Sequence, residues 1–146
     1  MRILFVDDEP ENVDFVRSLL AEVLDATVEQ VGSVQDAVAA LHRHDAEPVE
    51  LVITDVFIPV GEDPGLVMGP RARRAAKDIE HLGGLLLLDE IDRMHRPPVV
   101  LVHTACNEYA MVELLDEYGV NRVPKPAPVD VLLRAVLETL DLPVPQ

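Results

Sequence analysis

Short apolar runs that end at an acid or a hydroxyl recur along this chain and constrain its fold more than any other feature. Residues 2–7 and 49–54 are apolar at nearly every position, and Asp55 follows the second run directly. Such runs are typical of parallel strands buried on both faces. The strands expected from this pattern are 2–7, 26–31, 49–54, 98–103 and 119–123.

Between these runs the apolar residues recur every three or four positions, which indicates amphipathic helices. Ser33 is placed to cap one of them, and Pro128 is placed to open the last. Helices are expected after Pro10, after Ser33, at 71–82, at 85–94, after Asn107 and after Pro128. Strands that alternate with helices predict a parallel sheet covered by helices on both faces, with right-handed crossovers.

The connection after Asp55 is longer than this alternation requires. About forty residues separate Asp55 from the fourth strand, roughly twice what one loop and one helix need. We expect an inserted loop and short helix around 60–83, with a Gly- and Pro-rich stretch at 60–70 and four basic residues within 71–77. The insertion could be a lid, a docking surface for a partner or a second subunit, or a tolerated surface elaboration.

The 146 residues predict a single domain, 1–146, with a Pro-rich tail at 141–146 that is expected to fray. A net charge of −15 argues against binding to nucleic acid or to an anionic membrane. Cys106 is the one cysteine, which excludes an intrachain disulfide and fits a reducing cytoplasm. No apolar stretch is long enough for a signal peptide or a membrane span.

Five chemically active side chains are expected at one edge of the sheet. Ligands of open parallel sheets bind outside the carboxyl ends of the strands. The residues expected at these ends are Asp7, Asp8, Asp55, Thr104 and Lys125. Each alone has an ordinary explanation as a helix cap, a turn residue, a strand residue or a surface charge. Their coincidence at the same ends of successive strands points to one site.

Three neighbouring carboxylates cannot all ionise without a cation, because like charges raise each other's pKa. Oxygen ligands suit Mg²⁺, which binds one or two carboxylates together with phosphate oxygens. A carboxylate beside such a metal can attack phosphorus and become an aspartyl phosphate. A lysine and a hydroxyl can then contact the transferred phosphoryl group.

With these residues the chain resembles a response-regulator receiver domain of two-component signalling, the kind typified by the chemotaxis receiver. The matching residues are Val6-Asp7-Asp8-Glu9, Asp55 with Pro59, Gly84-Leu85, the run from Pro98 to Ala105, and Lys125-Pro126. The resemblance covers the chain except for about 60–83. It implies a flavodoxin-like, doubly wound sheet of five parallel strands in the order 2-1-3-4-5.

The resemblance also implies a role for each residue of the edge. By position, Asp55 is similar to the phosphoacceptor, Thr104 to the switch hydroxyl and Lys125 to the lysine that pairs with the phosphoryl group. The implied Mg²⁺ ligands are Asp8, Asp55, the backbone carbonyl of Phe57 and, mainly through water, Asp7. One departure is Arg122, which stands where the family usually has Tyr or Phe.

The function implied is that of a stand-alone receiver. A histidine kinase or histidine phosphotransferase would supply the phosphoryl group, and the chain would catalyse only its own phosphorylation and dephosphorylation. Only 21 residues follow Lys125, so we expect the output to be contact with a downstream protein or a homodimer. Two alternatives are a phosphorylation-independent interaction module, which Arg122 favours slightly, and a small phosphatase-like hydrolase that uses Asp55 as nucleophile.

Overall fold

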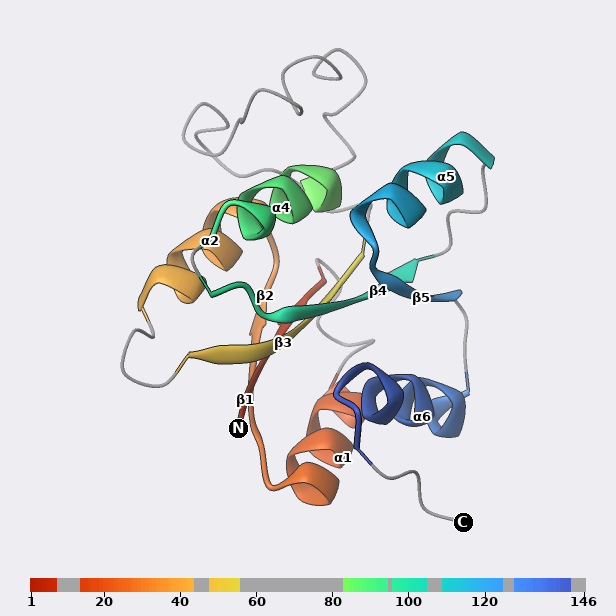
Figure 1. Ribbon diagram of the computed structural model, residues 1–146. Helices are drawn as coiled ribbons and strands as arrows, with labels where there is room; N and C mark the ends of the chain where they lie inside the picture. Colours follow the sequence, from red (N-terminus) through yellow and green to blue (C-terminus); the bar gives the residue numbers. More distant parts are fainter. Residues whose placement is uncertain are drawn as a thin grey trace.

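The computed structural model describes residues 1–7, 14–43, 48–55, 83–94, 96–104, 109–124 and 128–142. Strands and helices alternate along these ranges (Figure 1). The strands are β1 (Arg2–Val6), β2 (Thr27–Val31), β3 (Val49–Thr54), β4 (Val99–Thr104) and β5 (Asn121–Pro124). The helices are α1 (Asp14–Leu24), α2 (Val34–Arg43), α4 (Gly83–Asp92), α5 (Tyr109–Tyr118) and α6 (Val129–Thr139).

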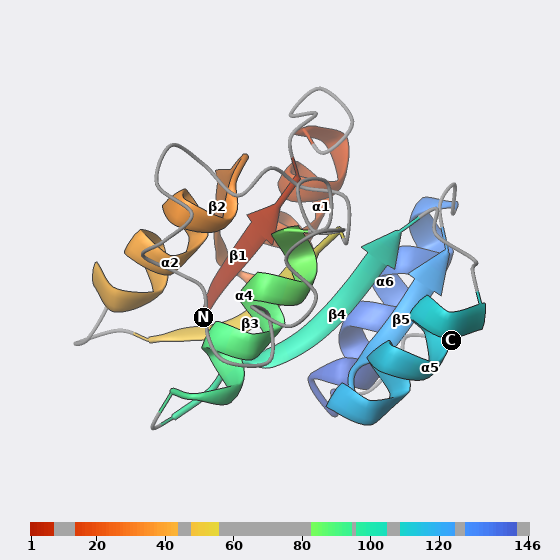
Figure 2. The same ribbon diagram turned by 90° about the horizontal axis from the view of Figure 1, so that it is seen from above.

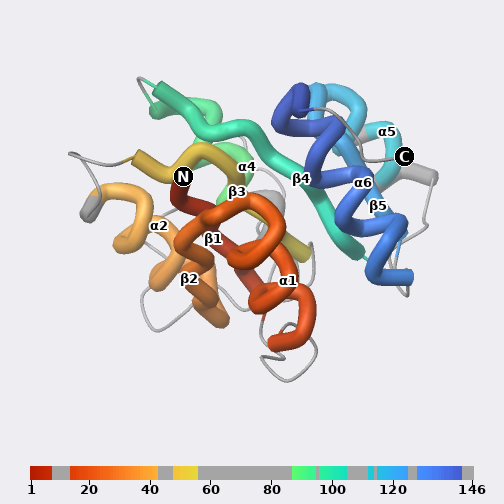
Figure 3. The backbone as a smooth tube through the Cα atoms, turned by 90° about the horizontal axis from the view of Figure 1, so that it is seen from below, coloured from red at the N-terminus to blue at the C-terminus, as the bar shows by residue number. Residues whose placement is uncertain are grey.

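The five strands form one sheet in the order β2-β1-β3-β4-β5, and every neighbouring pair is parallel. This confirms the flavodoxin-like order expected from the sequence. Helices α2, α4 and α5 cover one face of the sheet, as seen from above in Figure 2. Helices α1 and α6 cover the other face, as seen from below in Figure 3. The chain is therefore a three-layer α/β structure.

The two hydrophobic cores follow from the alternation of side chains along the strands. On β1, Leu4 and Val6 belong to the core beneath α2, α4 and α5, whereas Ile3 and Phe5 belong to the core beneath α1 and α6. The central strands supply both cores, which explains why they are apolar at nearly every position.

Local signals at the helix ends act as the sequence indicates. The Ser33 hydroxyl accepts a hydrogen bond from the backbone N–H of Asp36 at 3.1 Å, which confirms Ser33 as the cap of α2. Pro128 directly precedes α6. Helix α5 ends before Gly119, whose φ of +70° lies in the left-handed region that glycine adopts without strain.

Some boundaries differ from those expected. Strand β4 begins and ends one residue later than 98–103, so Thr104 is its last residue. Strand β5 lies at 121–124 instead of 119–123, because only Val123 among its four residues is buried and the apolar pattern is weak there. Helix α4 begins at Gly83, two residues before the expected start. The inserted loop at 60–70 and the helix at 71–82 lie outside the described residues.

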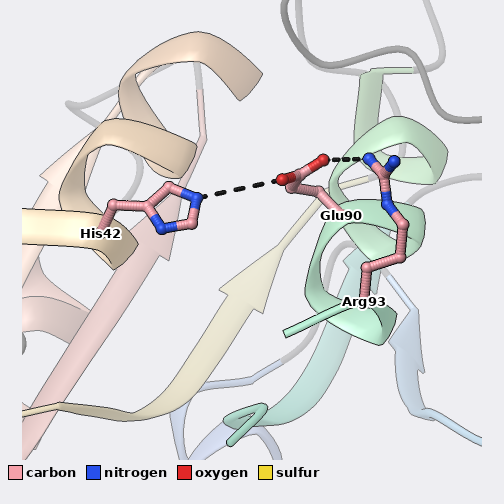
Figure 4. A network of polar contacts seen from close by, with 3 residues as sticks. All are labelled: His42, Glu90 and Arg93. Atoms are coloured by element: carbon pink, nitrogen blue, oxygen red, sulfur yellow. Dashed lines mark hydrogen bonds and ion pairs between the residues drawn. The ribbon is translucent and has the colours of Figure 1, made fainter. Parts of the chain in front are cut away.

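A polar network joins α2 to α4 on the outside of the first core (Figure 4). The Nε2 atom of His42 lies 3.9 Å from one carboxylate oxygen of Glu90, and the other oxygen accepts a hydrogen bond from Arg93. His42 is 61% exposed, so water screens this network. It forms a surface contact between two helices that already pack through apolar residues.

The network is expected to contribute little to stability. Glu90→Gln keeps the size of the side chain and removes its charge, and it should lower the free energy of unfolding by no more than about 1 kcal/mol. Urea denaturation of this variant, beside Glu113→Gln on the exposed surface of α5, would measure the difference. A loss of several kcal/mol would show that the α2–α4 contact depends on this polar network instead of on the core.

None of the helices that the structure describes has both the length and the apolar character needed to cross a membrane.

Candidate functional site

Two of the predicted acids lie next to each other at the carboxyl edge of the sheet. Val6 of β1 pairs with Thr54 of β3, and the following residues are Asp7 and Asp55. Neighbouring strands are about 4.8 Å apart, so the backbones at these two positions are adjacent. The parallel topology thus brings together residues that are almost fifty positions apart in the sequence.

Both acids are buried and anchored through their backbones. Asp7 is 3% exposed and Asp55 is 8% exposed. The N–H of Asp7 donates to the carbonyl of Val31 at 3.0 Å, and the N–H of Asp55 donates to the carbonyl of Val6 at 3.3 Å. Hydrogen bonds across β2, β1 and β3 therefore hold the main chain at both carboxylates.

Thr104 lies at the same edge, at the end of the next strand. It is 1% exposed and follows Val100 and Val102 at alternate positions, which places it on the face covered by α2, α4 and α5. Thr104 pairs with Pro124 at the end of β5. In the sequence Pro124 is followed by Lys125, the predicted cation of the site.

The structure describes three of the predicted site residues, namely Asp7, Asp55 and Thr104. It brings all three to one edge, at the ends of β1, β3 and β4. Asp8, Phe57 and Lys125 lie outside the described residues, so their roles stay predictions.

Three solved structures with a similar fold are receiver domains. The signal receiver domain of a putative Luxo repressor protein from Vibrio parahaemolyticus is 20% identical, with a TM-score of 0.71, and the match covers 96% of this chain and 89% of that one. The non-phosphorylated HemR receiver domain from Leptospira biflexa is 22% identical, with a TM-score of 0.71 and coverages of 99% and 98%. The BeF3-activated N-terminal receiver domain of RstA from Klebsiella pneumoniae is 21% identical, with a TM-score of 0.67 and coverages of 96% and 98%.

The chain has the fold of a response-regulator receiver domain. The expected strand order and the two helical layers agree with this fold over nearly the whole chain. No protein-family model matches the sequence, and no curated protein matches it either. At identities of 20 to 22% the likeness establishes the receiver fold and leaves the chemistry to the residues of the site.

The donor set at this edge of the receiver fold suits a hard divalent cation. Two acids, both more than nine-tenths buried, directly follow adjacent strands. Placing two ionised carboxylates together away from water is costly unless opposite charge or hydrogen bonds compensate. Among the residues that the structure describes, no three His, Cys, Asp or Glu side chains gather into a metal-binding group. The third acid of the predicted set, Asp8, falls outside these residues.

Sequence reasoning missed two side chains that hold the main chain beside the acids. Gln30 of β2 donates from Nε2 to the carbonyl of Asp7 at 2.6 Å, and Thr54 donates from its hydroxyl to the carbonyl of Asp55 at 3.0 Å. Thr54 stands within an apolar run, and Gln30 belongs to β2, an edge strand with a weak apolar pattern. The signal that they share is a polar residue in the last two positions of a strand, next to an acid in the sequence.

A groove of about 310 Å³ lies at the opposite edge of the receiver fold. The amino ends of β4 and β5 border it at Val99 and Asn121, together with Leu88 and Ile91 of α4 and Tyr118 of α5. It lies at the far ends of the strands from Asp7, Asp55 and Thr104. Buried carboxylates and a hydroxyl carry the chemistry, so we assign the functional site to the acidic edge instead of to this groove.

Proposed function

We propose that this chain is a response-regulator receiver that accepts a phosphoryl group on Asp55 in a Mg²⁺-dependent reaction. The observation that carries the proposal is the burial of Asp7 and Asp55 side by side at the carboxyl edge of a receiver fold, with Thr104 at the same edge. A histidine kinase or histidine phosphotransferase is the proposed donor. A cytoplasmic location is part of the same proposal.

Asp8, Asp55 and the carbonyl of Phe57 would hold Mg²⁺, with Asp7 acting mainly through water. When bound, the cation neutralises charge on the carboxylates and on the phosphoryl oxygens. A carboxylate oxygen of Asp55 attacks phosphorus, and the bond from phosphorus to the donor's imidazole nitrogen breaks. The electron pair of that bond stays on the nitrogen, which takes up a proton. The main-chain bond from Asp55 to Val6 supports this step by holding the nucleophile in place.

Thr104 and Lys125 are the proposed partners of the phosphoryl group. The hydroxyl of Thr104 donates a hydrogen bond to one phosphoryl oxygen, and the ammonium of Lys125 pairs with another. Thr104 ends β4 beside β5, so its movement toward the phosphoryl group would bias the surface formed by α5, β5 and α6 between two states. A downstream protein or a second copy of the chain would read this surface.

Arg122 is the residue that favours the alternative, an interaction module that does not depend on phosphorylation. It occupies the middle of β5 and is exposed. An aromatic ring that swings inward with the threonine is the usual coupling in the resembling family. In the proposed function, Arg122 contributes a positive charge to the output surface instead.

Incubation of the wild-type protein with acetyl phosphate and Mg²⁺ tests the proposal. We expect the intact mass to increase by one phosphoryl group, about 80 Da, and the increase to disappear when EDTA replaces Mg²⁺. Size measurement of the same samples would show whether phosphorylation drives dimerisation. No gain in mass would favour the phosphorylation-independent module, and steady release of phosphate from phosphate esters would favour a hydrolase.

A further inference from the structure

Gln30 makes a side-chain hydrogen bond to the main chain of Asp7. Its Nε2 lies 2.6 Å from the carbonyl oxygen of Asp7 and 3.0 Å from the carbonyl oxygen of Val31. A carboxamide nitrogen has two protons, and each has an acceptor here. Two carbonyl oxygens on one side also fix the orientation of the amide, since its own oxygen would repel both.

This contact lies just beyond the last paired residues of strands β1 and β2. Val6 pairs with Val31, and β1 ends at Val6. The N–H of Asp7 still donates to Val31, so the carbonyl of Asp7 is the next main-chain group along the chain. Gln30 supplies a donor to this carbonyl beyond the last paired residues of the two strands. Its side chain thus adds one hydrogen bond to the main chain beyond the last paired residues, at the carboxyl edge of the sheet where Asp7 and Asp55 lie.

The carbonyl that Gln30 holds belongs to the peptide bond between Asp7 and Asp8. A peptide unit is planar, so a hydrogen bond that fixes this oxygen also fixes the orientation of the main chain at Asp7. A local contact holds the carbonyl of the other acid, since the buried hydroxyl of Thr54 donates to the carbonyl of the next residue, Asp55. The carbonyls of both described acids therefore accept bonds from polar side chains of the strands.

We propose that Gln30 is a positioning residue that orients the main chain at Asp7 for cation binding. The inference rests on the proposed function and adds a residue that the receiver resemblance does not assign. Groups that orient metal ligands without touching the metal typically alter its affinity by 10- to 100-fold. Because Gln30 acts through one peptide unit, we expect an effect at the lower end of this range.

Gln30→Met tests the proposal, since methionine keeps the length of the side chain and removes its donor. Calorimetric titration with Mg²⁺ should give a dissociation constant about tenfold higher than in the wild type. Phosphoryl uptake from acetyl phosphate should slow by a similar factor below saturating Mg²⁺ and recover toward the wild-type rate at high Mg²⁺. Thr27→Val, at the other end of β2, is the matched control and should leave both measurements unchanged.

A second readout on the wild type separates positioning from a purely structural role. The side-chain NH₂ resonances of Gln30, assigned by through-bond experiments on the wild type, should shift during a Mg²⁺ titration of the intact chain. This measurement does not require the variant to fold.

Unchanged Mg²⁺ affinity in a folded Gln30→Met protein, or wild-type Gln30 resonances that ignore Mg²⁺, would overturn the inference while leaving the proposed function intact. A wild type that neither binds Mg²⁺ nor gains a phosphoryl group would overturn both.

Discussion

Asp55→Asn is expected to abolish the gain of about 80 Da that acetyl phosphate and Mg²⁺ give the wild type. Asparagine has the shape of aspartate, but its amide is a poor nucleophile toward phosphorus. The backbone bond from residue 55 to the carbonyl of Val6 does not involve the side chain and should persist. The variant should therefore fold and bind no phosphoryl group, which intact-mass spectrometry would detect directly.

Asp14→Asn is the matched control for this experiment. Asp14 carries the same side chain on the exposed first turn of α1, so its variant should gain the full mass. If Asp55→Asn still gained this mass, the phosphoacceptor would be another acid, and Asp8 would be the first to test. Thermal unfolding without Mg²⁺ adds a check, because removing one of two adjacent buried carboxylates should not lower the unfolding temperature.

Phe5→Ala should give the largest loss of stability among the simple truncations. Phe5 lies on β1, next to the centre of the sheet, and is 2% exposed within the core beneath α1 and α6. Truncation of a buried phenylalanine costs about 3 to 5 kcal/mol, through lost transfer free energy and the cavity left behind. Domains are typically stable by about 5 to 15 kcal/mol, so this is a large fraction of the total. Urea denaturation followed by circular dichroism would measure it.

Phe15→Ala provides the same substitution in a different environment. Phe15 is 68% exposed on α1, and its truncation should change the free energy of unfolding by less than about 0.5 kcal/mol. Equal losses at positions 5 and 15 would contradict the described division between a buried strand and an exposed helix face.

The fold could be predicted because its signals are repeated along the whole chain. The apolar runs of β1, β3 and β4 are buried on both faces, and that pattern is hard to satisfy except in a parallel sheet between helical layers. The cap at Ser33 is likewise local, because its acceptor and its donor lie three residues apart. The edge strand β5 starts two residues later and ends one residue later than expected, because Val123 alone is buried there.

The site residues that follow or end a strand could be predicted from the sequence. Asp7, Asp55 and Thr104 could be placed at one edge as soon as the strands were recognised. Gln30 could not, because its role depends on the β1–β2 register, which brings positions 7 and 30 together across 23 residues of sequence. The His42–Glu90 contact depends in the same way on how α2 and α4 pack. Nearly all of the insertion at 60–83 lies outside the described residues, and its role stays a prediction.

Strand β5 has a consequence for self-association. An exposed sheet edge can recruit a strand from another molecule, and proteins prevent this with short strands, prolines and charges. Strand β5 has all three, since it is four residues long, ends in Pro124 and carries the exposed Arg122. These features of β5 protect the sheet from pairing with a strand of another molecule at this edge. If two copies associate on this side, helix surfaces are the expected contact.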